Sequence, residues 1–166
     1  MWAWFNNFFG FHKEEKEEKM LALSADIMMK ACNFWPGMRL YEGLWIADVE
    51  YYLPERKEIE IALRHNQTNF RKFIDELWDC DDFALLLNAQ IKVQRAEKAR
   101  EGQILQDEWF PWAFGECWGT KFQGKKYKHA INICFTRDEG ILLIEPQTDE
   151  IWKANPKRDQ VYFIKI

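Results

Sequence analysis

Hydrophobic and polar residues follow a helical period in the first half of the chain and a strand period in the second half. Apolar residues recur at every third or fourth position within 12–33, 54–66, 70–77 and 80–100, as in helices with one buried face. Within 80–100, Phe83, Ala84 and Leu87 share the apolar stripe. We therefore expect this helix to pack that face on a sheet.

The second half of the chain has the composition of β-strands. Residues 109–128 are predicted to form β-strands, and Gly119 and Gly124 lie on either side of a hairpin tip. The segments 129–135 and 141–145 form a second hairpin that turns at 137–140, and 160–166 is a last strand. Because helices come first and strands follow, the pattern predicts an α+β domain with N-terminal helices packed on a C-terminal antiparallel sheet.

Composition is consistent with a single domain over residues 1–166, since the chain has 166 residues and 48% of them are hydrophobic. The net charge of −4 gives no electrostatic reason to bind nucleic acid. Residues 1–11 form an aromatic N-terminal arm, which we interpret as packed on the domain. Membrane contact by this arm is the alternative, and the scarcity of flanking basic residues disfavours it.

The four cysteines lack CxxC or zinc-finger spacing. The start of the sequence also lacks the basic region and small-residue cleavage site of a secretion signal. We therefore expect reduced thiols and a cytoplasmic protein that needs no cofactor or metal. No apolar run reaches the roughly 20 residues that a membrane-spanning helix requires.

Three residues in a specific order suggest nucleophilic chemistry. Cys80 lies in the first turn of a predicted helix, where the helix dipole favours a thiolate, although the neighbouring aspartates oppose it. His129 begins an apolar strand and could act as the base, and Glu145 could orient its ring. The backbone N–H of Cys80 and a second donor from Trp78, Gln67 or Asn69 could form an oxyanion hole.

Hairpin register decides which group orients His129. If Phe135 lies opposite Ile141, Glu145 is diagonal to His129 and within reach of it. In the same register Gln147 lies directly opposite His129, and with Arg137 opposite Ile141 instead, His129 faces Asp149. Gln147 and Asp149 therefore rank second and third.

The order of these residues resembles the transglutaminase-like and papain-like cysteine hydrolases over about residues 78–150. The resemblance rests on Asp79-Cys80-Asp81-Asp82-Phe83-Ala84, on His129-Ala130 and on Glu145-Pro146. It implies a papain/transglutaminase-like core and a catalytic triad of Cys80, His129 and Glu145. It also implies a peptidase or amidase that transfers the acyl group of a peptide, protein or cell-wall amide substrate.

The alternative is an inactive module of the same fold, of viral or prophage origin, that binds a protein or carbohydrate in an aromatic groove. Five residues are expected to contact the ligand in either case: Trp45, Tyr51, Trp78, Trp118 and Gln147. A metal site made by Cys80, His129 and Glu145 is a third, weaker hypothesis, because no short ligand spacing supports it.

Overall fold

A computed structural model describes residues 20–38 and 42–166. A six-stranded mixed sheet with the strand order β2-β8-β4-β5-β6-β7 forms its centre, and β1 and β3 pair in a separate two-stranded sheet. The elements in chain order are β1 (Leu21–Leu23), α1 (Ser24–Phe34), β2 (Leu44–Trp45), β3 (Glu50–Tyr52), α2 (Arg56–Arg64), η1 (Thr68–Phe70), α3 (Cys80–Arg100), η2 (Gln106–Glu108), β4 (Phe114–Lys121), β5 (His129–Phe135), β6 (Ile141–Glu145), β7 (Glu150–Lys153) and β8 (Gln160–Lys165).

Consecutive hairpins build most of the large sheet, since β4, β5, β6 and β7 pair antiparallel in chain order. The last strand, β8, then inserts between β4 and β2, antiparallel to β4 and parallel to β2. The close approach of β8 to β4 requires a glycine at position 115. A Cβ built on Gly115 would lie 2.0 Å from the carbonyl oxygen of Lys165.

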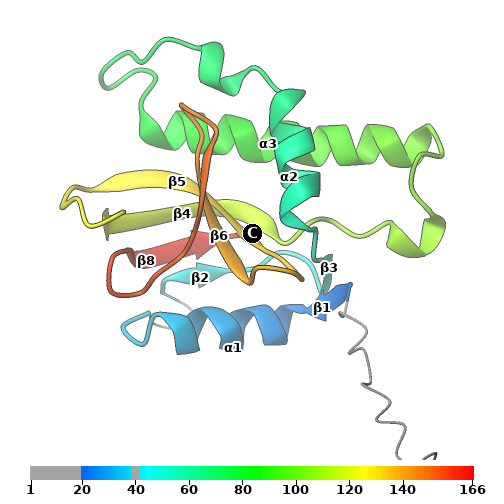
Figure 1. The fold of residues 1–166 in the computed structure, drawn as a ribbon, viewed down its shortest axis with the longest axis horizontal. Coiled ribbons are helices and arrows are strands. Elements are labelled where there is room, and N and C mark those ends of the chain that lie inside the picture. The colour runs from blue at the N-terminus through cyan, green and yellow to red at the C-terminus, as the bar shows by residue number, and fades with distance from the viewer. Residues whose placement is uncertain (1–19, 39–41) are drawn as a thin grey trace, which may run out of the picture.

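Helices cover both faces of this sheet. Helix α1 lies on one face, while α2 and α3 lie on the other, as Figure 1 shows. Ile27 and Ala31 of α1 pack with one set of sheet residues, and Leu87 of α3 packs with the opposite set, which includes Cys134. The predicted packing of the apolar face of α3 on the sheet is therefore confirmed.

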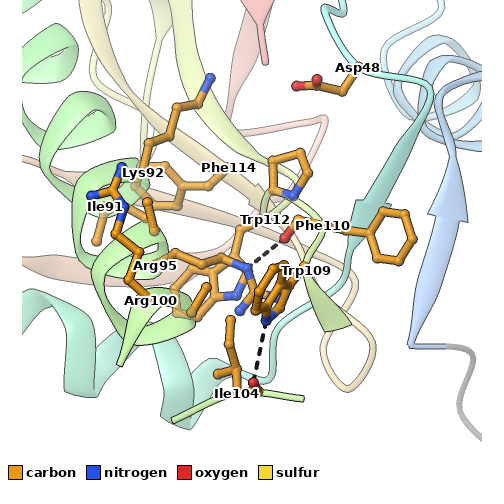
Figure 2. A pocket seen from close by; sticks show the side chains of 13 residues that line it. Asp48, Ile91, Lys92, Arg95, Arg100, Ile104, Trp109, Phe110, Trp112 and Phe114 are labelled. Carbon is orange, nitrogen blue, oxygen red and sulfur yellow. Dashed lines mark hydrogen bonds between the residues drawn. The ribbon is translucent and has the colours of Figure 1, made fainter. Parts of the chain in front are cut away.

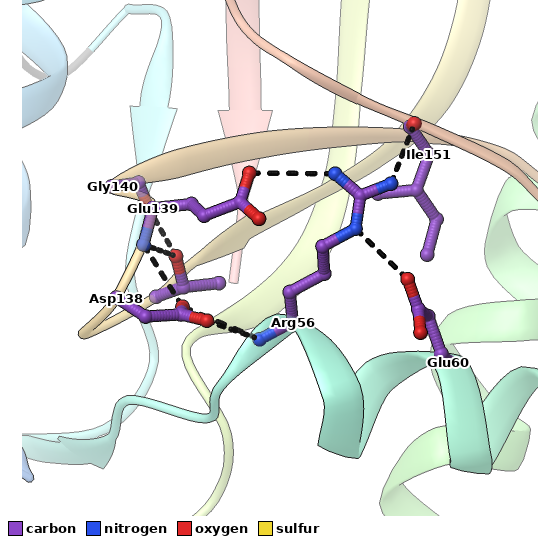
Figure 3. A network of polar contacts seen from close by, with 7 residues as sticks. Arg56, Glu60, Asp138, Glu139, Gly140 and Ile151 are labelled. Atoms are coloured by element: carbon purple, nitrogen blue, oxygen red, sulfur yellow. Dashed lines mark hydrogen bonds and ion pairs between the residues drawn. The ribbon is translucent and has the colours of Figure 1, made fainter.

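Polar contacts tie the start of α2 to the turn between β5 and β6 (Figure 3). The backbone N–H of Arg56 donates to Asp138, 3.1 Å away, and its guanidinium bonds Glu60 at 2.9 Å and Glu139 at 3.4 Å. The guanidinium also donates to the carbonyl of Ile151. These contacts hold α2 against the end of the sheet that is remote from His129.

The predicted fold class is wrong in its main feature. Among the described residues the structure is mostly sheet, with eight strands in two sheets, and it is not the predicted papain-like α+β core in which helices come first and strands follow. Strands from the first half of the chain contribute to both sheets, and β2 pairs in parallel with β8. Strands of two or three residues carry too few positions to show a period, so the sequence pattern did not reveal them.

Two further segments also bear on the sequence predictions. The helix expected over 70–77 is absent, since only the short turn of η1 and an isolated bridge between Ile74 and Trp78 form there. The arm 1–11 lies outside the described residues. In the described ranges, none of the helices combines the length and the apolar character needed to span a bilayer.

Candidate functional site

The first turn of α3 holds Cys80 in place through a capping box. The Asp79 side chain accepts a hydrogen bond from the backbone N–H of Asp81, and the Asp82 carboxylate accepts one from the N–H of Asp79. These contacts satisfy N–H groups that have no partner within the helix. The acidic residues around Cys80 therefore have a structural role at the helix start, and Cys80 is partly buried beside them.

His129 and Glu145 meet at the end of the sheet. In the observed register Phe135 lies opposite Ile141 and Asn132 lies opposite Ile144. Two strands that continue in this register place Glu145 diagonally from His129. The His129 Nε2 lies 2.7 Å from the Glu145 Oε2, and the two side chains are only 12% and 17% exposed.

The other two candidates for orienting His129 have different partners. Asp149 accepts a hydrogen bond of 2.7 Å from the side-chain amide of Asn69, and burial raises the pKa of its carboxyl. The backbone N–H of Gln147 donates to Glu145 Oε1. The carboxylate that contacts the imidazole is therefore Glu145.

Cys80 interacts with the same imidazole. Burial alone would lower the pKa of His129, but hydrogen bonding to Cys80 and Glu145 outweighs it and raises this pKa to about 9. With Nε2 engaged by Glu145, Nδ1 is the nitrogen left for the thiol. With this pKa the ring is charged at neutral pH, and it lies beside the sulfur.

Two aromatic rings lie beside the His129 imidazole. Tyr127 and Phe122 lie 5.2 Å and 6.1 Å from the His129 ring, measured between ring centroids. Phe122 comes from the predicted hairpin tip between Gly119 and Gly124, and Tyr127 comes from the segment between that tip and His129. Their proximity in the sequence to His129 was the signal that could have identified them.

A row of three aromatic side chains crosses the adjoining strands on the α3 side of the sheet. Trp118 lies opposite Ala130, the neighbour of His129, and its ring meets Phe163 edge to face at 4.9 Å. Phe163 in turn lies 6.1 Å from Trp45, which is 59% exposed on the short edge strand β2. We call Trp45, Phe163 and Trp118 the aromatic row. Phe163 was missed because the alternation of β8 in the sequence is imperfect.

The remaining predicted ligand contacts differ in how accessible they are. Tyr51 is fully buried in the core under α1, and its hydroxyl accepts a hydrogen bond from the N–H of Asp48, so the prediction that it lines a groove is wrong. Trp78 packs against Phe83 and beneath the guanidinium of Arg71. Its buried Nε1 has no hydrogen-bond partner among the described residues, so it is a free donor close to the thiol in sequence.

Asn69, another candidate oxyanion donor, has its amide N–H group committed to Asp149. A possible set of metal ligands in the described ranges consists of Asp79, Cys80 and Asp81, whose ligand atoms lie within 4.8 Å of one another. Because the Asp79 carboxylate already caps α3, this cluster is explained without a metal ion.

Comparison with known proteins identifies solved structures of similar fold. No protein-family model matches the chain, and no curated protein matches it. Among solved structures, it is similar to that of PSL1a in complex with E64, with a TM-score of 0.69 and 19% identity over 90% of this chain and 52% of that chain. It is also similar to Polyporus squamosus lectin bound to the human-type influenza-binding epitope Neu5Aca2-6Galb1-4GlcNAc, with a TM-score of 0.67 and 20% identity over 90% of this chain and 50% of that chain.

These findings correct the assignment made from sequence motifs. The structures to which the chain is similar are those of a lectin, which overturns the proposed membership of the transglutaminase-like and papain-like cysteine hydrolases and the description as a thiol protease. The chain spans about half the length of these lectin structures. At this level of identity the similarity establishes the fold alone, which this chain shares with about half of each lectin chain.

Proposed function

We propose that this domain binds a carbohydrate ligand on the aromatic row. The observation that carries the proposal is the unbroken succession of ring contacts, at 6.1 Å and 4.9 Å, from the exposed Trp45 to Trp118. Aromatic rings offer large, rigid apolar surfaces, and the C–H faces of sugar rings pack well on such surfaces. An exposed Trp on an edge strand, rather than in the core, suits this use.

Polar groups beside the aromatic row can supply hydrogen bonds to sugar hydroxyls. Lys165 lies opposite both Trp45 and Glu116 in the sheet, and its ammonium is 3.8 Å from the Glu116 carboxylate. The amide of Asn88 donates to the same carboxylate at 2.8 Å, which fixes its position. A stacking surface flanked by a few fixed polar groups is the usual composition of a small-molecule site.

The similarity to a lectin that was solved with a sialylated trisaccharide supports this proposal and suggests the first ligand to test. Titration with Neu5Aca2-6Galb1-4GlcNAc, followed by tryptophan fluorescence and calorimetry, should detect binding. Trp45→Ala should weaken it about tenfold, the value of one well-placed aromatic contact. Trp109→Ala is the matched control, because Trp109 is similarly exposed at 54% but belongs to the segment that follows the C-terminal end of α3. Equal affinity in the Trp45 variant, or no binding of any glycan tested, would contradict the proposal.

The contacts of His129 with Cys80 and with Glu145 favour a second candidate function, nucleophilic thiol chemistry on an acyl group. The Cys80 Sγ would attack the carbonyl carbon of a bound ligand. His129 would then give its proton to the departing amine or alcohol, which leaves the acyl group on sulfur. Glu145 would hold the ring for both steps. The roles of the three residues in this reaction are part of the proposal.

Alkylation separates this candidate from an inert buried cysteine. Cys117 and Cys134 are completely buried, and burial raises the pKa of each thiol well above its usual value. Iodoacetamide should therefore label Cys80 first, with the partly buried Cys32 as the informative comparison.

The imidazole can be tested in the same assay. His129→Ala should slow labelling of Cys80, because the positive charge beside the sulfur is removed. His65→Ala is the matched control, since His65 is exposed at the end of α2. If Cys80 reacts no faster than Cys32 in the folded protein, the thiol candidate fails and only carbohydrate binding remains.

A further inference from the structure

A cavity of about 420 Å³ opens between the C-terminal half of α3 and the segment that leads into β4. Most of its lining is apolar, and Figure 2 shows indole rings on one side and the α3 side chains on the other. Trp112 and Phe114 are buried, while Trp109 at the edge is 54% exposed. The volume is within the range of sites that enclose small organic ligands.

Cations predominate around this apolar space. Arg95, Lys92 and Arg100 all line it, and the acidic lining residue is Asp48. Lys92 and Arg100 are exposed at the rim. A ligand held in the cavity would therefore meet a positive electrostatic potential at its polar end.

Arg95 is the cation that the fold holds most tightly. Its Nε donates to the carbonyl of Phe110 at 2.6 Å and its Nη2 to that of Glu108 (Figure 2 draws the first). The guanidinium also lies over the rings of Tyr52 and Trp112, at 4.5 Å and 5.7 Å. In the described ranges no carboxylate forms an ion pair with it, and its Nη1 donates no hydrogen bond. The carboxylates of Glu58 and Glu108 act on this guanidinium only from beyond ion-pair distance, so an anion that approached it directly would gain a favourable interaction.

We propose that this cavity binds an amphipathic organic anion, with the apolar body against Trp112 and Phe114 and the carboxylate or sulfonate near Arg95 and Lys92. The apolar lining selects the body, and the excess of cations over carboxylates in the lining selects the charged head group. The site is separate from the thiol, since Arg95 lies fifteen residues along α3 from Cys80, about 22 Å at the helical rise.

Decanoate is a suitable probe, and decanol is its neutral counterpart. Calorimetric titration of the whole chain should detect decanoate binding, with decanol at least tenfold weaker because it lacks the charge. Lys92→Glu should raise the dissociation constant about fivefold, the size expected for a partly exposed ion pair. Lys126→Glu, which makes the same charge change in the exposed turn before β5, should leave it unchanged.

Two further variants test where the ligand lies. Ala99→Phe should abolish binding by filling the cavity, and circular dichroism checks that this variant folds. If it does not fold, the comparison of the Lys92 and Lys126 variants carries the test. Trp45→Ala should leave decanoate affinity unchanged, which separates this site from the aromatic row. Equal affinity for decanol and decanoate, an equal effect of the two lysine changes, or no binding of decanoate would each overturn the proposal.

Discussion

Replacing Glu145 by Gln should remove a pH-dependent part of the stability of the domain. The pKa of His129 is about 9 in the folded protein and 6.5 without its partners. At about 1.4 kcal/mol for each pH unit, this difference amounts to about 3 kcal/mol of stabilisation of the protonated ring. Cys80 contributes to the same increase, so we expect Glu145→Gln to remove about 2 kcal/mol of it.

The direction of the pH dependence follows from the higher folded pKa. A group whose pKa rises on folding stabilises the protein fully below its unfolded pKa of 6.5, and this stabilisation is lost as the pH rises through about 9. The difference in unfolding free energy between the wild type and Glu145→Gln should therefore be largest near about pH 6 and fall below about 1 kcal/mol near pH 10.

Urea unfolding followed by tryptophan fluorescence at several pH values measures this difference. Nuclear magnetic resonance of the His129 ring should show its titration moving towards neutral pH in the variant. His65→Gln is the matched control, because His65 is exposed at the end of α2. The reasoning is refuted if the stability difference stays constant between about pH 6 and pH 10, or if His129 titrates identically in both proteins.

Two further predictions concern the packing of the sheet. Gly115→Ala should destabilise the domain by more than about 3 kcal/mol or prevent folding, because the added Cβ would lie 2.0 Å from the Lys165 carbonyl oxygen. Gly37→Ala is the control: a Cβ at that position meets nothing within 4 Å, so the melting temperature should hardly change. Leu87→Asp should cost several kcal/mol because it buries a charge in a fully enclosed site, and Leu85→Asp, at a half-exposed position of the same helix, should change stability by less than about 1 kcal/mol. Similar melting temperatures within either pair would show that the packing described for these positions is wrong.

The local pattern of hydrophobic and polar residues correctly predicted the helices and strands that depend mainly on their own residues. The bounds of α3 agree with the prediction because Asp79 caps the helix and an apolar stripe follows it. The bounds of β5 and β6 agree for a similar reason, since both are apolar runs on either side of a turn that ends at Gly140, whose φ of +88° suits glycine. The contact between His129 and Glu145 then follows from hairpin register alone.

Features that depend on distant partners were not predictable in this way. The strand β2 has two residues and exists because β8 pairs with it from the other end of the chain. Tyr51 was expected at a surface because its neighbours are aromatic and irregular, yet it lies in the core where α1 covers it. The family was also misjudged, since short motifs fix the local placement of three side chains but do not fix the arrangement of the whole sheet.

The position of β8 has a consequence for how the domain is made. This strand lies between β2 and β4 within the large sheet, although it is the last of the described strands to leave the ribosome. Until it arrives, β4 has an unpaired edge and the core residue Ile164 is missing from beneath α1. The hairpins β4 to β7 can form during synthesis, but closure of the sheet must wait for β8, and exposed strand edges are sites of aggregation. Nascent chains stalled before Gln160 should therefore depend on chaperones in a way that completed chains do not.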